Sequence, residues 1–262
     1  MPTDLIDRAR SAAHDRVELP GMSLMEHLDE LRKRLLWAAI YLLLGCAVAW
    51  FFHSGLANIV QKPLLSIGLK MTMTHPIDAM NYYIKTSIVF GAIFASPLIL
   101  YQIWLFISPG MYSNEKRYVI PFMGVTVLLF LAGAWFGYRY VLPGAMHFLV
   151  EDIGKNFTHM ITIEDYTDFF MSVILGLGFT FEMPVVIFFL ALFGIVDAKF
   201  LLRHFRYAVL AIFLLAAILC PDPSPIGMTV FALPMLFLYF VGVLVAYLVH
   251  PDHRNKKKAA GV

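Results

Sequence analysis

Charged side chains are scarce in this sequence. Only 15% of its 262 residues are Asp, Glu, Lys or Arg, whereas 60% are hydrophobic. An ordinary soluble domain has roughly 45–50% apolar residues, so this composition argues against a soluble fold. Several apolar runs exceed the ~18 residues that mark a transmembrane helix. We therefore predict a polytopic, all-α membrane protein with a single membrane domain.

Cysteine pairs and catalytic motifs are also missing. The two cysteines, Cys46 and Cys220, both lie in apolar runs, so they support neither a disulfide framework nor a metal cluster. The chain has no phosphate-binding loop, no His-Glu-x-x-His motif and no Gly-x-Ser-x-Gly motif. We therefore expect no enzymatic activity, no cofactor and no metal, and we predict no nucleic-acid partner. The first twenty residues lack the apolar core of a secretory signal peptide.

Six apolar segments predict six transmembrane helices. The first continues an amphipathic helix that begins with a capping box, in which Ser23 is the N-cap and Glu26 the third residue. We expect short surface helices in residues 53–83 and a second external segment at residues 143–168. The expected spans are residues 35–52, 85–107, 118–142, 169–195, 207–220 and 226–249. The membrane domain (23–249) is flanked by a mobile tail (1–22) and a basic tail (250–262).

The fifth span is short for a bilayer. Its fourteen residues rise about 21 Å as a helix, against a hydrocarbon core of ~30 Å. We predict that this hairpin thins the lipid beside it. Gly133 and Gly137 have the GxxxG spacing that favours close helix packing. Proline predicts four kinks, at Pro63, Pro97, Pro184 and Pro234.

Positive charge is distributed unevenly between the two sides that six spans define. Fifteen of the twenty Lys and Arg residues fall in the terminal segments or in the loops after the second and fourth spans. The other five are Lys62, Lys70, Lys85, Arg139 and Lys155. Because cytoplasmic segments carry the excess of Lys and Arg, both termini are predicted to be cytoplasmic.

Glu182 lies within the apolar run of the fourth span, two residues before Pro184. An ionised group near the bilayer centre costs roughly 2.5–3.5 kcal/mol, so such a side chain usually faces the protein interior or a wet cavity. One alternative is a buried pair, and another is a neutral carboxyl group that is hydrogen-bonded inside the bundle. We interpret Glu182 as part of a wet, concave groove shared by several helices.

Two further acids lie at the cytoplasmic ends of predicted spans. Glu30 precedes Arg34 by four residues, a spacing that favours a helix-stabilising pair. Glu115 follows Asn114, and a carboxylate at such a helix start is favoured by the helix dipole. The functional alternative for both acids is the binding of a cationic ligand, because carboxylates bind guanidinium groups through paired, charge-assisted hydrogen bonds. Spacing alone leaves both interpretations open.

Several motifs occur in a specific order between residues 23 and 249. They are His27–Leu35 (HLDELRKRL), Ser96-Pro97, Tyr101–Tyr112 (YQIWLFISPGMY), Glu115–Arg117 (EKR), Phe181–Pro184 (FEMP), Pro221–Pro223 (PDP) and Ala232–Pro234 (ALP). Their order, spacing and six-span context resemble the TatC family, the core subunits of the twin-arginine protein translocase.

This resemblance implies a receptor in the cytoplasmic (inner) membrane, with short fifth and sixth helices and a kinked fourth helix. Members of the family bind signal peptides that carry paired arginines. They assemble with the single-span subunits TatA and TatB and export folded proteins at the expense of the proton-motive force; self-association is left open. By position, the implied signal-peptide site contains Glu30, Arg32, Arg34, Phe106, Glu115 and Arg117. Glu115 and Glu30 would bind guanidinium groups, and Phe106 would pack against the peptide.

The chain departs from the family pattern at Cys220, Met228 and Phe240, where members commonly have a threonine, a glutamine and an acid. These positions border the surface that the resemblance assigns to the single-span subunits. The rival hypothesis is a proton-coupled small-solute transporter in which Glu182 carries the proton. Such transporters usually show internal repeats, and no second half of this sequence mirrors the first.

Overall fold

The described residues are almost entirely helical. The structure, a computed structural model, describes residues 24–107, 119–156, 159–192, 194–219 and 225–249. Within these ranges, the only β-type pairing is a single bridge between Thr72 and Thr162. The helical elements are α2 (Leu24–Phe51), α3 (His53–Ser66), α4 (Asp78–Ile107), α5 (Val119–Phe136), η3 (Gly137–Val141), α6 (Leu142–His147), η4 (Phe148–Ile153), η5 (Gly154–Asn156), α7 (Ile163–Thr180), α8 (Met183–Leu192), α9 (Ala198–Arg203), α10 (Phe205–Leu219) and α11 (Pro225–Val249).

Among the residues that the structure describes, five helical stretches are long and apolar enough to cross a membrane. They are Met25–Phe51, Asp78–Ile107, Phe122–Val150, Ile163–Leu192 and Gly227–Val249, and they coincide with five of the six predicted spans. The fifth predicted span corresponds to α10, which has only 15 residues and is as short as expected. The expectation of a short sixth helix is wrong, because α11 has 25 residues. The crossing of the membrane by α10 stays a prediction.

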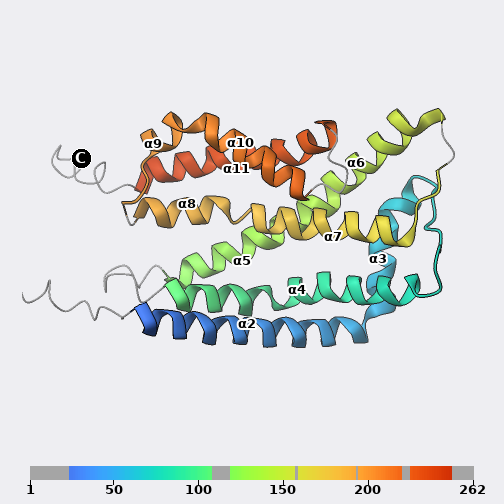
Figure 1. The fold of residues 1–262 in the computed structure, drawn as a ribbon, viewed down its shortest axis with the longest axis horizontal. Helices are drawn as coiled ribbons and strands as arrows, with labels where there is room; N and C mark the ends of the chain where they lie inside the picture. The colour runs from blue at the N-terminus through green and yellow to red at the C-terminus, as the bar shows by residue number, and fades with distance from the viewer. Residues whose placement is uncertain (1–23, 108–118, 157–158, 193, 220–224, 250–262) are drawn as a thin grey trace, which may run out of the picture.

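The long helices run along the longest axis of the molecule (Figure 1). In this view α2 and α4 lie at the bottom, α9, α10 and α11 at the top, and α5, α7 and α8 between them. α3 crosses the right-hand end, where α6 ends and α7 begins, whereas α2 begins and α4 and α8 end on the left. The described segments predicted to be cytoplasmic therefore share one end, and those predicted to be external share the other.

Glycines allow two pairs of helices to approach closely. A Cβ added at Gly45 of α2 would lie 2.4 Å from the carbonyl oxygen of Gly91 in α4. A Cβ added at Gly133 of α5 would lie 2.5 Å from the carbonyl oxygen of Leu177 in α7. The close packing predicted from the Gly133–Gly137 spacing is confirmed. The contact between Gly45 and Gly91 is a second close approach of this kind, and it sets how α2 and α4 lie against each other.

Two predicted helix boundaries are wrong. The third long helix does not end near Leu142 but continues through α6, η4 and η5 to Asn156. Pro143 is tolerated there because it lies in the first turn of α6, directly after the wider π-helical turns of η3. The second long helix begins at Asp78 rather than near residue 85, because Asp78 Oδ2 accepts hydrogen bonds from the backbone N–H groups of Thr74 (2.8 Å) and His75 (2.7 Å).

The fourth long helix is interrupted between α7 and α8, as Pro184 predicts. Phe181 and Glu182 form a turn between the two helices. Pro184 has no N–H to donate to the carbonyl of Thr180, and the N–H of Glu182 bonds to the carbonyl of Phe179 at 3.1 Å. The helices continue through the other three prolines, Pro63, Pro97 and Pro234. A helix break is therefore confirmed only at Pro184.

Three tyrosine hydroxyls hold α3 against the long helices. Tyr82 of α4 donates to the carbonyl oxygen of Ala57 (2.9 Å), Tyr138 of η3 to that of Ile59 (3.0 Å), and Tyr166 of α7 to that of Val60 (2.8 Å). The presence of a short helix within residues 53–83 is confirmed, and its position at the membrane surface stays a prediction. The helix is fastened to three different long helices, so it forms a fixed part of the bundle.

Candidate functional site

The first turns of α2 pack a polar face against the last turns of α4. His27, Glu30 and Arg34 are three and four residues apart, so they lie on one face of α2. Arg34 Nη2 donates a hydrogen bond to Glu30 Oε1 at 3.1 Å, and Arg34 Nη1 donates to Gln102 Oε1 of α4 at 3.3 Å. The predicted pair of Glu30 and Arg34 is confirmed, and Gln102 ties it to a second helix.

This Glu30 cluster (His27, Glu30, Arg34, Gln102 and Phe106) is shielded from solvent and incompletely paired. The side chains of Glu30 and Arg34 are 15% and 24% exposed. Among the described residues, Glu30 Oε2 and Arg34 Nε are buried without a hydrogen-bond partner. Buried polar atoms without partners are costly. The cluster therefore has unused capacity to accept one hydrogen bond and to donate another.

An aromatic stack lies on the same face. The ring of Phe106 stacks on His27 with a centroid separation of 4.4 Å and an interplanar angle of 20°. Phe106 follows Gln102 by four residues, so both project from one side of α4. The structure therefore brings together three of the predicted site residues, Glu30, Arg34 and Phe106. An apolar ring next to a partly paired carboxylate suits a ligand with a cationic and an apolar part.

The remaining predicted site residues divide into two groups. Arg32 is exposed on α2, and it lies on a different side of the helix because it is two residues from both Glu30 and Arg34. Glu115 and Arg117 lie outside the described residues, as do Cys220 and both tails, so their roles stay predictions. His27 and Gln102 were not predicted. The one sequence signal for Gln102 is a polar residue near the end of an apolar span.

Glu182 lies in the turn between α7 and α8. Both of its carboxylate oxygens are buried, and neither has a hydrogen-bond partner among the described residues. The alternative of a buried ion pair is therefore not found within the part of the chain that the structure describes. The interpretation of Glu182 as part of a wet groove is not tested by this geometry and stays a prediction.

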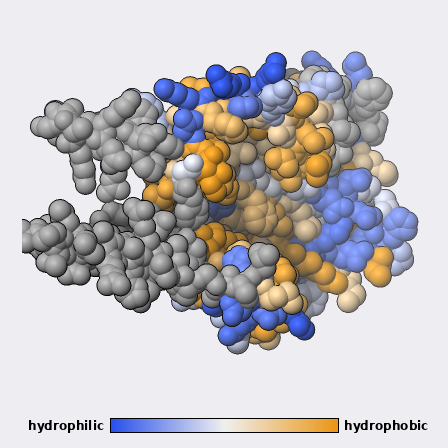
Figure 2. Space-filling model, turned by 60° about the vertical axis from the view of Figure 1, so that its left-hand side comes forward, coloured by the Kyte–Doolittle hydropathy of each residue, from blue (hydrophilic) through white to orange (hydrophobic). Residues whose placement is uncertain are grey.

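One face of the molecule is hollowed. Figure 2 shows a hollow, coloured mainly as hydrophobic, between the α9–α11 region at the top of the view and the α2–α4 region at the bottom. It opens on the side that faces the viewer when the end holding the Glu30 cluster is turned forward. A role for this hollow as a binding groove stays a prediction.

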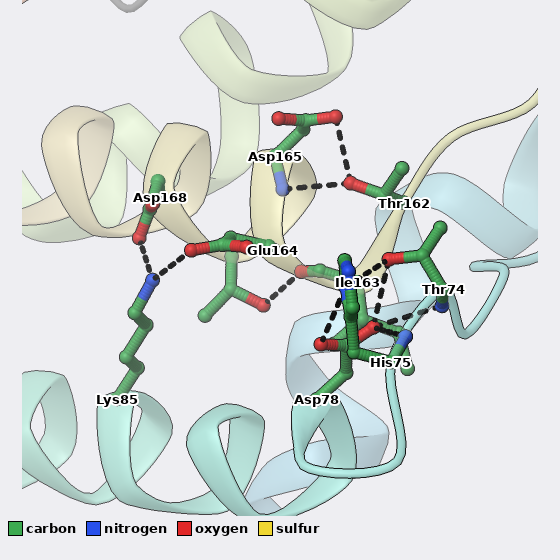
Figure 3. A network of polar contacts seen from close by, with 10 residues as sticks. Thr74, His75, Asp78, Lys85, Thr162, Ile163, Glu164, Asp165 and Asp168 are labelled. Atoms are coloured by element: carbon green, nitrogen blue, oxygen red, sulfur yellow. Dashed lines mark hydrogen bonds and ion pairs between the residues drawn. The ribbon is translucent and has the colours of Figure 1, made fainter.

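A second polar cluster lies at the other end of the long helices (Figure 3). Lys85 of α4 donates to Asp168 Oδ1 of α7 at 2.5 Å and lies 3.9 Å from Glu164 Oε1. Thr162 caps α7 by accepting a hydrogen bond from the N–H of Asp165 at 3.0 Å, which confirms the predicted helix start. The contacts of Lys85 connect α4 to α7, and the Thr162 cap fixes the start of α7. No group of three or more His, Cys, Asp or Glu residues that could hold a metal ion occurs among the described residues.

Comparison with known proteins shows one consistent family. Residues 26–234 match the family described as Sec-independent protein translocase protein (TatC). A TatC protein of Koribacter versatilis is 45% identical over 99% of this chain and 98% of its own length. A TatC protein of Aquifex aeolicus is 34% identical over 91% of this chain and 100% of its own length.

A solved structure has the same fold. The crystal structure described as the twin-arginine translocase receptor TatC superimposes with a TM-score of 0.78 at 34% sequence identity. The match covers 86% of this chain and 99% of that chain. The arrangement of helices in Figure 1 is therefore similar to that of a known translocase receptor.

Proposed function

The chain belongs to the TatC family of Sec-independent protein translocases, and on that premise we propose that it is the signal-peptide receptor and assembly scaffold of a twin-arginine translocase. Such a complex exports folded proteins across the cytoplasmic membrane and is driven by the proton-motive force. TatC proteins form a transport family rather than an enzyme family, so no enzymatic reaction is assigned to the chain.

The Glu30 cluster is the observation that carries this proposal. A twin-arginine signal peptide presents guanidinium groups, which carboxylates bind through charge-assisted hydrogen bonds. Arg34 occupies Oε1 of Glu30, whereas Oε2 has no partner among the described residues. Gln102 in turn holds Arg34, so the carboxylate is oriented before the ligand arrives. Because Oε2 is covered in the free protein, binding requires a neighbouring side chain to move.

The rest of the proposed site surrounds this carboxylate on the cytoplasmic face. Phe106 provides an apolar ring against which the peptide packs, and its stack on His27 holds that ring in place. Arg32, Glu115 and Arg117 complete the site. Glu115 binds a guanidinium group together with Glu30, so that two carboxylates serve the two arginines.

The cytoplasmic location of the site is supported by the distribution of charge. In the sequence, the segments predicted to be cytoplasmic carry fifteen of the twenty Lys and Arg residues, so we place both termini in the cytoplasm. The single-span subunits TatA and TatB are proposed to bind α10 and α11. Exposed apolar side chains on these helices suit such partners: Leu210 (69%), Leu214 (63%), Ile218 (72%) and Phe240 (49%).

Glu182 fits this proposal as a polar group within the hollow surface of a protein-binding scaffold. Its buried, unpartnered carboxyl group would gain hydrogen bonds when a polar segment or water enters. The transporter hypothesis rests instead on the position of Glu182 within an apolar run of the sequence. That hypothesis loses its support because the chain belongs to a family of protein translocases.

Exchange of Glu30 for Gln tests the proposal directly. Glu30→Gln keeps the size of the side chain and removes its charge, so the affinity of the purified protein for a twin-arginine peptide should fall about tenfold. Titration of a fluorescently labelled peptide, followed by anisotropy, measures this affinity. Asp29→Asn is the matched control, because Asp29 is an exposed acid on the neighbouring position of α2.

Equal affinity of the wild type and Glu30→Gln would contradict the assigned role of Glu30. In the same assay Glu115→Ala should weaken binding while the protein still inserts into the membrane. A peptide with Lys-Lys in place of Arg-Arg should bind less tightly, because an ammonium group cannot form the planar, two-pronged contact of a guanidinium group. A peptide titration without this preference would count against carboxylate recognition.

A further inference from the structure

A cavity is lined by residues of α3 and its neighbours. In Figure 1, α3 crosses the end of the long helices opposite to the start of α2, which holds the Glu30 cluster. The cavity has a volume of about 480 Å³ and is formed by α3, the segment after it, the first turns of α4 and Ile163 of α7. Its polar lining residues are Gln61, Lys70, Tyr82 and Tyr83, and the others are apolar. The lining therefore combines four polar residues with six apolar ones, and the apolar part resembles the interior of a membrane.

The polar lining residues offer hydrogen-bond donors, and no carboxylate in the lining competes for them. No Asp or Glu is among the residues that line the cavity. Lys70 is exposed and forms no ion pair with any residue that the structure describes. Gln61 Nε2 uses one N–H on the hydroxyl of Tyr82 at 3.5 Å, which leaves its second N–H available. A cation and an amide donor in a lining without an acid favour an anionic group.

The hydroxyl of Tyr82 is already hydrogen-bonded, and its bonds hold the polar lining residues next to it in place. Tyr82 is 4% exposed and donates to the carbonyl oxygen of Ala57 at 2.9 Å. The ring of Tyr83 packs edge-on against Tyr82, with a centroid separation of 5.5 Å. Gln61 and Tyr83 are therefore held by a buried neighbour, and Lys70 is the exposed cation that lines the cavity with them.

The apolar part of the lining decides between a soluble anion and an amphiphile. Leu64, Leu69 and Met71 border the cavity together with the polar residues, and a small hydrated anion gains nothing from them. α3 crosses the ends of the long helices, at the level where lysine and tyrosine side chains meet lipid headgroups. We propose that this cavity binds one phospholipid with an anionic headgroup, whose phosphate contacts Lys70 and Gln61 and whose acyl chains contact the apolar lining.

The number of lipids that remain bound to the purified protein tests this site. Protein is loaded with phosphatidylglycerol or phosphatidylcholine in detergent and examined by native mass spectrometry. Wild-type protein should retain phosphatidylglycerol in preference to phosphatidylcholine. Lys70→Gln should reduce the retained phosphatidylglycerol about tenfold, because a charge-assisted contact is lost, and Lys70→Arg should restore it.

Lys62→Gln is the matched control, because Lys62 is an exposed lysine of α3 that does not line the cavity. Equal losses in Lys62→Gln and Lys70→Gln would overturn the proposal in favour of diffuse attraction to the surface. Unchanged retention in Lys70→Gln would overturn it as well. Displacement of the lipid by glycerol 3-phosphate at similar concentration would show a soluble-anion site instead. Twin-arginine peptide binding should be unaffected by Lys70→Gln, so this proposal and the receptor function fail separately.

Discussion

At the residue scale, α3 is attached to the long helices through hydrogen bonds to single carbonyl groups. Pro63 lies inside α3 and has no N–H, so the carbonyl of Ile59, four residues earlier, lacks its normal helical donor. The hydroxyl of Tyr138 supplies a hydrogen bond to this carbonyl at 3.0 Å. A helix defect caused by proline is therefore used as an attachment point for another helix. The proline and the tyrosine form one structural unit although they are far apart in the sequence.

We predict that Tyr138→Phe lowers the free energy of unfolding by about 1 kcal/mol, the usual contribution of one hydrogen bond. The cost should be smaller in a Pro63→Ala background, because the new N–H can then bond to the carbonyl of Ile59. Thermal unfolding of the four proteins in detergent gives this coupling as a double-mutant cycle. Tyr140→Phe is the control, since Tyr140 is 54% exposed. Strictly additive effects of the two substitutions would contradict the shared carbonyl.

The contacts of single residues also show which parts of the candidate site could be predicted from the sequence. The pairing of Glu30 with Arg34 follows from their spacing on one helix. Gln102 lies 68 residues from Arg34 in the sequence, and its contact depends on how α2 lies against α4. Sequence periodicity describes one helix at a time and carries no information on this relative position. The placement of Phe106 could be anticipated only from the family resemblance.

The contact between α2 and α4 controls the site at the element scale. Gly45 and Gly91 meet backbone to backbone, and this contact determines which turns of the two helices face each other toward their ends. The Glu30 cluster is built across the same pair of helices. Separation of α2 from α4 at the glycines should therefore also disturb the contact of Arg34 with Gln102.

Gly45→Ala tests this dependence. The added methyl group would lie 2.4 Å from a backbone oxygen, which no side-chain movement relieves, so we predict a loss of about 1–3 kcal/mol in the free energy of unfolding. Affinity for a twin-arginine peptide should fall as well. Gly124→Ala is the control, because a Cβ at Gly124 has open space around it. Unfolding and peptide titration are measured on the same preparations; normal binding by a destabilised Gly45→Ala protein would separate the site from the helix contact.

Helix boundaries were harder to predict than the helices themselves. The apolar runs identify the long helices because burial in a bilayer requires them. The predicted end of the third span is near Leu142, directly before Pro143. The π-helical turns of η3 before it leave room for the ring, and no residue pattern announces such turns. The early start of α4 depends on the hydrogen bonds that Asp78 accepts from Thr74 and His75, a local motif within the segment 53–83, for which only short surface helices are predicted.

The two ends of the whole molecule have different chemistry. One end presents the partly paired Glu30 cluster, which suits a ligand that arrives and leaves. The other end is held together by internal contacts, among them the Lys85–Asp168 pair (Figure 3) and the tyrosines that hold α3. Recognition at one end and a fixed frame at the other suit a scaffold that binds a signal peptide from the cytoplasm. The lengths of the helices also differ across the molecule.

This difference in length leads to a prediction for the surrounding lipid. α10 has 15 residues and rises about 22 Å, whereas the 27-residue span of α2 rises about 40 Å. A hydrocarbon core of ~30 Å must thin to cover the ends of α10. We predict that cryo-electron microscopy of the protein in lipid nanodiscs shows a thinner bilayer beside α10 than beside α2. Insertion of four leucines into α10 should abolish the thinning and reduce export, whereas Leu214→Ile, which keeps the length, should change neither. Full-thickness, flat lipid beside wild-type α10 would contradict the prediction, because the mismatch would then be absorbed by the protein alone.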